Sequence, residues 1–331
     1  MRANNMVPYP LSCRPLFKEK VWGGRRLREL LGKDLPPDAP VGESWEVADL
    51  PEGSSTINNG PLSGRSLTEA VGEHREMILG SSAARIRFPL LVKFIDAHDD
   101  LSVQVHPDAE TCRAHFPSER GKDETWIVVH AEPGARLMCG LRDGVDASQL
   151  QTQVETGEVI GCLNTIEPLP GDVLRIPPGT VHALGSGIVV LEIQEPSDTT
   201  FRLFDYHRPG MDGAPRALNL RESLLSIRHH SVSPIGPIVD TNEWGKTEYL
   251  IASPAYRIER WHVQAPMTLE NALDTPKVAV LLGGELTMRS GEYSLAMRPG
   301  SSVIFPASLE RVTIEPALPC CLIIAEPGEG A

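Results

Sequence analysis

Three separated stretches of the sequence carry side chains that can bind a divalent metal ion. They are Leu101-Ser-Val-Gln-Val-His-Pro-Asp108, Gly121-Lys-Asp-Glu-Thr-Trp126 and Pro170-Gly-Asp-Val-Leu-Arg-Ile-Pro-Pro-Gly-Thr-Val-His182. Together they supply an amide oxygen, two imidazoles and a carboxylate, from Gln104, His106, Glu124 and His182. Two histidines and one carboxylate suit zinc with an exchangeable fourth ligand, and they also suit non-haem iron. The residues therefore predict a metal centre and leave the metal open.

The spacing of these residues indicates how a sheet would hold them. Gln104 and His106 are two residues apart, which places both side chains on one face of a strand. Gly171, Pro177, Gly179 and His182 follow the spacing of the second motif of cupin jelly rolls, a β-barrel architecture. The first motif differs, because Gln104 stands where a histidine is usual and an insertion with a helix over 108–116 displaces Glu124.

A second group of side chains combines charge with apolar neighbours. Arg202 alternates with Phe201 and Leu203, so it projects from a strand whose neighbours are apolar. A buried arginine needs an anionic partner. One interpretation is an internal salt bridge with Asp198 or Asp205, and the other is an active-site cation.

Two lysines show the same pattern. Lys93 is a lone charge within the apolar run 90–95, and Lys122 precedes Glu124 by two residues. If a strand begins at Lys122, its side chain faces the same way as Glu124.

The order of predicted elements favours a mainly β fold with helices in its N-terminal part. The chain has 29 glycines and 29 prolines in 331 residues, and many turns imply many short strands. Helices are predicted over 25–31, 66–79, 108–116 and 146–157, with Ser66 and Glu69 forming a capping box. Strand follows strand from about residue 247, and the turn-rich segment 215–237 is the best candidate for a domain boundary.

A short internal sequence repeat indicates a duplication. The stretch 170–182 aligns without gaps to 299–311, sharing Pro-Gly, an apolar strand and a further proline. Arg311 falls opposite His182, so the second copy lacks that metal ligand.

The composition excludes several classes of protein. The net charge of −13 argues against nucleic-acid binding, and it requires a local cationic pocket for any anionic substrate. The first ten residues hold no apolar signal core, the apolar runs are strand-length, and the six cysteines form no Cys-x-x-Cys pair. We therefore expect a reduced, cytoplasmic protein with no membrane span. The sequence does not distinguish a monomer from a homodimer.

Several motifs in order resemble one family, the class I mannose-6-phosphate isomerases in their short bacterial form. Besides the three metal-ligand stretches, the resemblance rests on the stretches 21–24, 42–46, 88–93, 131–135, 192–194 and 197–202. It runs in register from about residue 8 to 208 and is weaker beyond. It implies two cupin-type jelly-roll domains, a zinc-binding catalytic domain at 1–220 with helical insertions and a metal-free domain at 221–331.

The resemblance also implies the chemistry, the interconversion of mannose 6-phosphate and fructose 6-phosphate. One zinc ion would be bound by Gln104, His106, Glu124 and His182, with Arg202 as the catalytic arginine. Such an isomerisation moves a proton through a cis-enediolate, so it needs charge stabilisation and a general base. Lys122, Glu43 and a zinc-bound water remain open as the base, and Lys122 is included among the predicted catalytic residues.

Four further residues are predicted to bind substrate. Lys93 and Ser102 are expected to contact the phosphate, and Glu43 and Trp22 belong to matching stretches. Phe201 and Phe204 replace frequent tyrosines of the family, which affects the expected shape of the sugar pocket.

Two other functions compete with the isomerase. The first is an iron-dependent cupin oxygenase on the same ligands, against which Gln104, Lys122 and Arg202 count. The second is a non-catalytic sugar-binding cupin, against which retention of every proposed ligand counts.

Overall fold

The computed structural model describes residues 6–270 and 274–329. Over these ranges the chain is mainly β, which confirms the predicted fold class, and the described helices all lie before residue 227. The chain forms two compact units, each discontinuous in sequence. The central unit comprises Phe17–Ser44 and Val92–Ile235, and the terminal unit comprises Met1–Leu16, Trp45–Leu91 and Gly236–Ala331. A division into domains at residue 220 stays a prediction, and these units group the chain differently.

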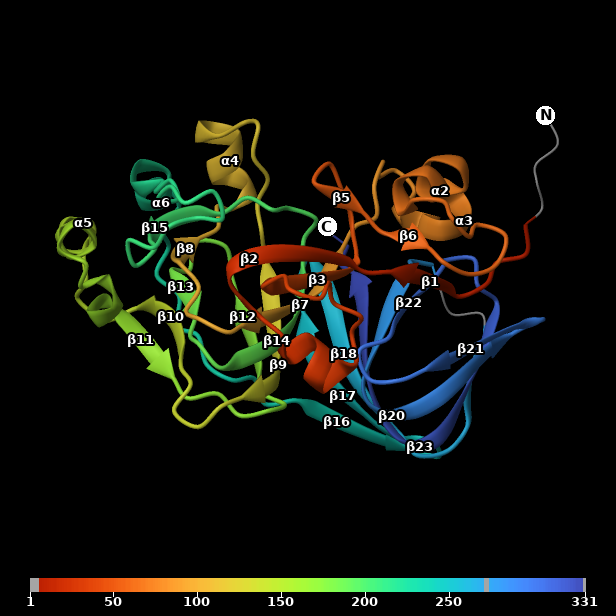
Figure 1. Ribbon diagram of the computed structural model, residues 1–331. Coiled ribbons are helices and arrows are strands. Elements are labelled where there is room, and N and C mark those ends of the chain that lie inside the picture. The colour runs from red at the N-terminus through yellow and green to blue at the C-terminus, as the bar shows by residue number, and fades with distance from the viewer. Residues whose placement is uncertain (1–5, 271–273, 330–331) are drawn as a thin grey trace. The chain divides into compact units, whose positions relative to one another are not determined.

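The central unit contains two antiparallel sheets (Figure 1). The six-stranded sheet has the order β12-β9-β14-β7-β3-β2, and the five-stranded sheet has the order β11-β10-β13-β8-β15. The strands are β2 (Leu16–Gly24), β3 (Val41–Val47), β7 (Leu91–Ala97), β8 (Val103–Val105), β9 (Glu124–Ala131), β10 (Leu137–Leu141), β11 (Leu163–Ile166), β12 (Val173–Ile176), β13 (His182–Leu184), β14 (Ile188–Gln194) and β15 (Phe201–Phe204). The helices are α1 (Arg26–Leu31), α4 (Ala109–His115), α5 (Ala147–Thr156), the 3₁₀ turn η2 (Val159–Cys162) and α6 (Leu220–Ser226).

The two sheets enclose one apolar core. Trp126 and Val190 of the six-stranded sheet belong to the same buried cluster as Leu137, Cys139 and Leu184 of the five-stranded sheet. Because side chains alternate along a strand, each inner row continues in steps of two residues. Those rows become polar at one end, because Glu124 lies two residues before Trp126 and His182 lies two residues before Leu184. The interior is thus apolar at one end and polar at the other.

Helices cover the outer face of the five-stranded sheet. Val103 and Val105 of β8 share a second buried cluster with Leu150 and Val154 of α5, and Leu224 of α6 packs against it. Apolar residues on both sides of Gln104 therefore fix the face of β8 that turns outward, and Gln104 is left on the inner face.

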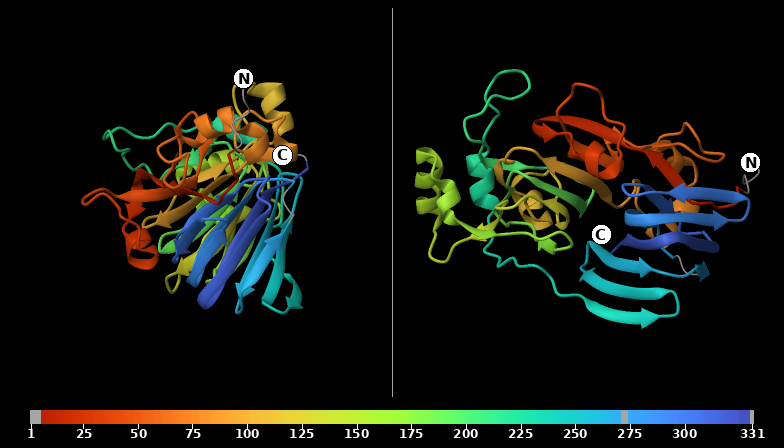
Figure 2. Two further views of the ribbon diagram at one scale, coloured as in Figure 1. Left: turned by 90° about the vertical axis from the view of Figure 1, so that its right-hand side faces the viewer. Right: turned by 60° about the horizontal axis from the view of Figure 1, so that its bottom comes forward.

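The terminal unit is built on a ten-stranded sheet with the main order β16-β17-β18-β23-β20-β22-β1-β6 (Figure 2). Its strands are β1 (Leu11–Arg14), β6 (Thr56–Ile57), β16 (Ile238–Asn242), β17 (Gly245–Ala252), β18 (Tyr256–Val263), β19 (Met267–Glu270), β20 (Lys277–Ser290), β21 (Tyr293–Met297), β22 (Ser302–Phe305) and β23 (Arg311–Pro327), with the small pair β4 (Asp49–Leu50) and β5 (Gly53–Ser54) beside it. The long strands β20 and β23 change register between Leu281 and Leu286. Gly284 permits this bend, since its φ is +82° and a Cβ there would lie 2.3 Å from the carbonyl oxygen of Pro319.

The remaining helices of the terminal unit confirm a predicted cap and correct a predicted length. The Ser66 side chain accepts from the amide of Glu69, and the Glu69 carboxylate accepts from the amide of Ser66. The single helix expected over 66–79 is wrong, because the chain breaks at His74 into α2 (Leu67–Glu73) and α3 (Arg75–Leu79), followed by the turn η1 (Gly80–Ser82). His74 has φ −129° and ψ 39°, which lies outside the helical region.

No described helix has the length and apolar character that a membrane crossing requires.

Candidate metal centre and its pocket

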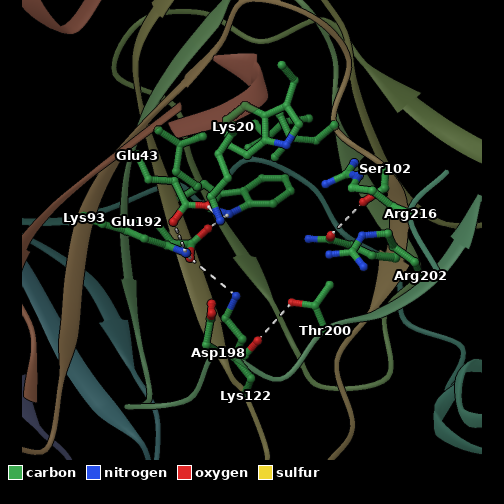
Figure 3. Close-up of a pocket in the computed structure, with 16 residues that line it drawn as sticks. Lys20, Glu43, Lys93, Ser102, Lys122, Glu192, Asp198, Thr200, Arg202 and Arg216 are labelled. Carbon is green, nitrogen blue, oxygen red and sulfur yellow. Dashed lines mark hydrogen bonds and ion pairs between the residues drawn. The ribbon is translucent and has the colours of Figure 1, made fainter. Parts of the chain in front are cut away.

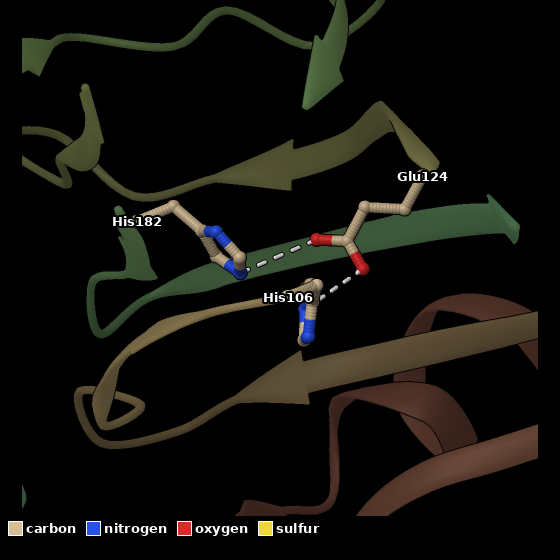
Figure 4. A group of neighbouring side chains, drawn as sticks. All are labelled: His106, Glu124 and His182. Atoms are coloured by element: carbon tan, nitrogen blue, oxygen red, sulfur yellow. Dashed lines mark ion pairs between the residues drawn. The ribbon is translucent and has the colours of Figure 1, made fainter. Parts of the chain in front are cut away.

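Three of the predicted ligands meet at the polar end of the central unit (Figure 4). His106 follows β8, Glu124 begins β9 and His182 begins β13, and one ligand atom from each lies within 4.8 Å of the others. Nε2 of His106 and Nε2 of His182 are each 3.4 Å from a carboxylate oxygen of Glu124. All three side chains are buried, so the cluster lies away from bulk solvent.

The backbone fixes the proton on each imidazole. Nδ1 of His106 lies 2.8 Å from the carbonyl oxygen of Thr199, and Nδ1 of His182 lies 2.9 Å from that of Thr180. A carbonyl oxygen only accepts, so Nδ1 carries the hydrogen and Nε2 presents a lone pair toward Glu124. Neither carboxylate oxygen of Glu124 has a partner in strict hydrogen-bond geometry, although the Lys122 ammonium lies 2.7 Å from Oε2 and 3.3 Å from Nε2 of His106. Lone pairs of three buried side chains converge beside this single ammonium, and a bound metal ion would satisfy the lone pairs that it leaves free.

Burial keeps both imidazoles neutral. Removal from water lowers the pKa of His106 to about 4, and the charge of Lys122 acts in the same direction. Burial likewise lowers the pKa of His182. Burial alone would raise the pKa of Glu124, but the Lys122 ammonium, 2.7 Å from Oε2, holds it well below the usual value. An anionic carboxylate and two neutral imidazoles are the forms that bind a metal.

This electrostatic state predicts a pH dependence of stability without metal. Since the pKa of His106 is about 4 in the folded protein and about 6.5 in an unfolded chain, the unfolded chain binds more protons between these values. The free energy of unfolding of chelated protein should therefore fall on acidification, by about 2 kcal/mol from His106 between pH 7 and pH 5. Urea unfolding at each pH measures it. The His106→Gln variant should show a weaker dependence, and an equal dependence in both proteins would contradict the assignment.

A tight turn aims His182 at the cluster. The segment Pro177–Thr180 reverses the chain after β12, and the amide of Gly179 donates to the carbonyl oxygen of His106 at 2.7 Å. Gly179 has φ +89°, and a Cβ there would lie 2.5 Å from Cγ of Arg228. A glycine is therefore required in this turn, and the turn ties both histidines together.

Gln104 lies at the edge of the cluster. It pairs with His182 on β13 and with Arg202 on β15, and its Nε2 is 3.2 Å from Nε2 of His182. The hydroxyl of Ser102 donates to Oε1 of Gln104 at 3.2 Å. The amide thus links the cluster to the pocket beside it.

A polar pocket of about 150 Å³ adjoins the cluster within the central unit (Figure 3). It contains all of the other predicted site residues together with side chains that the sequence did not single out. The pocket is lined by Lys20, Trp22, Glu43, Lys93, Ile95, Leu101, Ser102, Gln104, Lys122, Trp126, Leu184, Glu192, Asp198, Thr200, Arg202 and Arg216.

One side of the pocket is a network of alternating charges (Figure 3). Nζ of Lys93 lies 3.0 Å from Glu192 and 4.0 Å from Glu43, and Lys20 lies 3.1 Å from Glu43. Nζ of Lys122 lies 3.5 Å from Glu192 as well as close to Glu124. Burial alone would lower the pKa of Lys93, but the carboxylates of Glu192 and Glu43 raise it overall. On this side of the pocket the positive charges of the lysines and the negative charges of the glutamates offset each other.

Lys93 is therefore expected to be structurally important. The Lys93→Met variant keeps the apolar stem but removes the ammonium that Glu192 and Glu43 share, leaving Lys122 and Lys20 to offset these two carboxylates, and we expect a loss of about 3 kcal/mol of stability. Chemical denaturation measures the loss. Adding Glu192→Gln to this variant removes one of the two carboxylate charges and should recover part of the stability. A double variant no more stable than Lys93→Met would contradict the pairing.

The opposite side of the pocket presents arginines (Figure 3). Among the described residues Arg202 forms no recorded ion pair, and its Nε is buried without a hydrogen-bond partner. The salt bridge considered for Arg202 with Asp198 or Asp205 is wrong: in the described structure neither carboxylate forms an ion pair with Arg202, and Asp205 instead contacts Arg208 and Arg216. Burial lowers the pKa of Arg202, and repulsion from Arg216 lowers it further. Arg202 thus presents to the pocket a guanidinium that no described carboxylate contacts directly, although the charges of Asp205 and Asp198 act on it from farther away.

Sequence reasoning missed three of the charged lining residues, Lys20, Glu192 and Arg216. Glu192 is a lone charge in the fully buried strand β14, the same signal that identified Lys93, and its Oε2 accepts from Trp126 at 2.9 Å. Arg216 lies in an irregular segment after β15, where no periodicity indicates a direction.

Comparisons with known proteins identify relatives of this chain. A family model described as phosphomannose isomerase type I, catalytic domain, matches residues 10–129. A mannose-6-phosphate isomerase of Streptococcus mutans is 34% identical over 302 residues, 91% of this chain and 93% of that protein. The mannose-6-phosphate isomerase ManA of Bacillus subtilis is 34% identical over 316 residues, 95% and 98% of the two chains. The solved mannose 6-phosphate isomerase of Bacillus subtilis has a TM-score of 0.88 at 30% identity, covering 96% of this chain and 99% of its own.

The antiparallel sheets, the buried His/Glu/His cluster and the charged pocket together define a class, a β-sheet protein with a candidate metal site inside its fold. With relatives aligned over nearly their full length, the chain belongs to the mannose-6-phosphate isomerase family.

Proposed function

We propose that the protein is a cytoplasmic, zinc-dependent isomerase that interconverts mannose 6-phosphate and fructose 6-phosphate. The observation that carries this proposal is that the His/Glu/His cluster and the charged pocket meet at Gln104. Gln104 is a neighbour of His182 in the buried cluster and lines the pocket that holds Arg202 and Lys122. A metal ion at the cluster would therefore face a sugar in the pocket. Residues 1–220 are proposed as the catalytic domain and 221–331 as a metal-free domain.

The donor set fits zinc. Two imidazole nitrogens and one carboxylate are a common set of protein ligands at a catalytic zinc, with further positions for an amide oxygen, water or substrate. Rotation of the Gln104 amide by half a turn would bring its oxygen toward His182, so Gln104 is proposed as the fourth protein ligand. Zinc bound by these residues would act as a Lewis acid toward the sugar oxygens.

The chain's own residues supply the rest of the chemistry. Isomerisation moves a proton between adjacent carbons through a cis-enediolate, whose oxygens carry negative charge. Nε of Arg202 is buried without a hydrogen-bond partner in the described structure, and the guanidinium is proposed to stabilise that charge. Lys122, between Glu124 and Glu192, is proposed to take part in moving the proton.

Four lining residues are proposed to bind the substrate. Trp22 provides an apolar wall, and Glu43, Lys93 and Ser102 provide polar groups that can hydrogen-bond to its oxygens. Shape and hydrogen bonds at these positions would orient the sugar against the cluster.

A coupled assay with mannose 6-phosphate on zinc-loaded protein tests the proposal. Formation of fructose 6-phosphate is expected, and the absence of turnover would overturn the proposed activity. Metal analysis and oxygen-uptake measurements on protein purified without added metal separate the isomerase from an iron oxygenase on the same ligands. Binding of mannose 6-phosphate without conversion would indicate a sugar-binding protein instead.

A further inference from the structure

The arginine side of the pocket contains a charge arrangement that the proposed chemistry does not use. Nε of Arg216 lies 2.6 Å from Oδ2 of Asp205, and Nη2 of Arg216 contacts Oδ1. Asp205 is 4% exposed and also accepts from Arg208. The two hydrogen bonds from Arg216 to Asp205 hold the guanidinium by the edge that carries Nε and Nη2, and neither uses Nη1.

The backbone after Asp205 adopts an unusual conformation next to its contacts with Arg208 and Arg216. Tyr206 and His207 have φ of +57° and +53°, in the left-handed region that residues with side chains seldom occupy. They turn the chain directly after Asp205, and the amide of Arg208 donates back to the Asp205 carbonyl oxygen at 3.1 Å. Such a strained conformation persists where surrounding contacts support it, and here those contacts include Asp205 with two arginines and the rings of Tyr206 and His207 against Phe204.

The balance of charge distinguishes this side from the rest of the pocket. Asp205 provides one negative charge for two arginines, and neighbouring Arg202 has no recorded ion pair among the described residues. Arg202, Arg208 and Arg216 against the Asp205 carboxylate leave two positive charges in excess, and Asp198, which lines the same pocket and acts on both Arg202 and Lys93, offsets part of that excess. On the other side, carboxylates of Glu43 and Glu192 offset Lys20 and Lys93. A phosphate monoester carries a charge of about −1.5 to −2 at pH 7, which matches the arginine side.

We propose that Arg216 binds the phosphate of the substrate, with Asp205 as the residue that positions its guanidinium. This inference rests on the proposed function for the identity of the sugar phosphate. Ser102, which lies with Arg202 and Arg216 in Figure 3, is close enough to this side to share the role expected of it from the sequence. Lys93, held by two carboxylates, would then contact the sugar and not the phosphate.

The Arg216→Gln variant tests the assignment in zinc-loaded protein. Two probes are used: glucitol 6-phosphate, which has no carbonyl group and cannot isomerise, and inorganic phosphate as a competitor. Loss of a charged hydrogen-bonding group should weaken binding of each probe about 10- to 100-fold. Arg216→Lys keeps the charge without the planar fork and should recover part of the affinity. The exposed Arg221 provides the matched control, and Arg221→Gln should bind both probes like the wild type.

Asp205→Asn tests the positioning role. It should raise the KM for mannose 6-phosphate by a larger factor than it lowers kcat, because the guanidinium remains but is no longer held. Loss of kcat alone would contradict that role, and unfolding measurements identify a variant that has lost its fold.

The outcomes separate this inference from the proposed function. Wild-type protein that binds glucitol 6-phosphate through Arg216 but converts no mannose 6-phosphate would overturn only the activity. Wild-type turnover together with undiminished binding of both probes in Arg216→Gln would overturn the phosphate assignment alone. Weaker binding of inorganic phosphate in Lys93→Met, but not in Arg216→Gln, would move the phosphate to the lysine side.

Discussion

The Glu124→Gln variant is expected to lose most of its bound metal and to isomerise mannose 6-phosphate about 10³-fold more slowly than the wild type. Glu124 is the one anionic member of the cluster, and its two oxygens each face an imidazole nitrogen at 3.4 Å. A neutral amide keeps the shape of the side chain but removes the charge that offsets a divalent ion. Metal content per chain and kcat/KM are measured on the same preparation.

Chelation and a charge-matched variant complete this experiment. Wild-type protein treated with a chelator should lose activity and regain it on addition of zinc. Glu110→Gln makes the same chemical change at an exposed position of α4 and should retain both metal and activity. If Glu124→Gln kept a full complement of metal, or if chelated protein stayed active, the cluster would not be the metal centre.

The close approach of these three ligands was predicted from the spacing of the cupin motif and the family resemblance, whereas spacing within a strand determines only the face that each side chain occupies. The apolar neighbours Val103 and Val105 assign Gln104 to the inner face, and the Pro-Pro-Gly turn before His182 signals a sharp reversal. Both inferences require only local rules. The structure then adds the pairing of His182 with Gln104, which brings distant stretches together.

Other features depend on contacts between distant residues and carry weaker local signals. Arg216 lies in an irregular segment after β15, and its side chain, which lines the pocket, hydrogen-bonds to Asp205. The division of the chain is similar: residues 45–91 group with 236–331, although they lie between two segments of the central unit. The break at His74 separates two short helices within one continuous helical pattern, which local propensity did not reveal.

The sequence repeat between 170–182 and 299–311 shows which structural features a short motif predicts and which it does not. Both stretches form a strand followed by a turn, β12 in one case and β22 in the other. His182 is buried in the cluster, whereas the Arg311 side chain is 66% exposed and lies 3.6 Å from Glu270. The repeated frame therefore predicts backbone shape, and the residue at its end decides whether the position can bind a metal.

Arg202→Gln is expected to lower kcat about 10²- to 10³-fold while the bound metal stays in place. The Arg202 guanidinium is partly buried, has no recorded ion pair among the described residues and stands next to Gln104 across β8 and β15. If it stabilises charge that develops on the sugar oxygens, its removal raises the barrier more than it weakens substrate binding. Steady-state kinetics with mannose 6-phosphate, combined with metal analysis, measure both effects.

Two variants make the result specific to this position. Arg202→Lys retains a positive charge without the planar fork, so its kcat should lie between those of the wild type and Arg202→Gln. Arg216→Gln removes the neighbouring guanidinium and should act mainly on KM, because its proposed contact is with the phosphate in ground state and transition state alike. If Arg202→Gln raised KM with little change in kcat, Arg202 would be a binding residue, and the charge of the enediolate would have to be stabilised by other groups of the site.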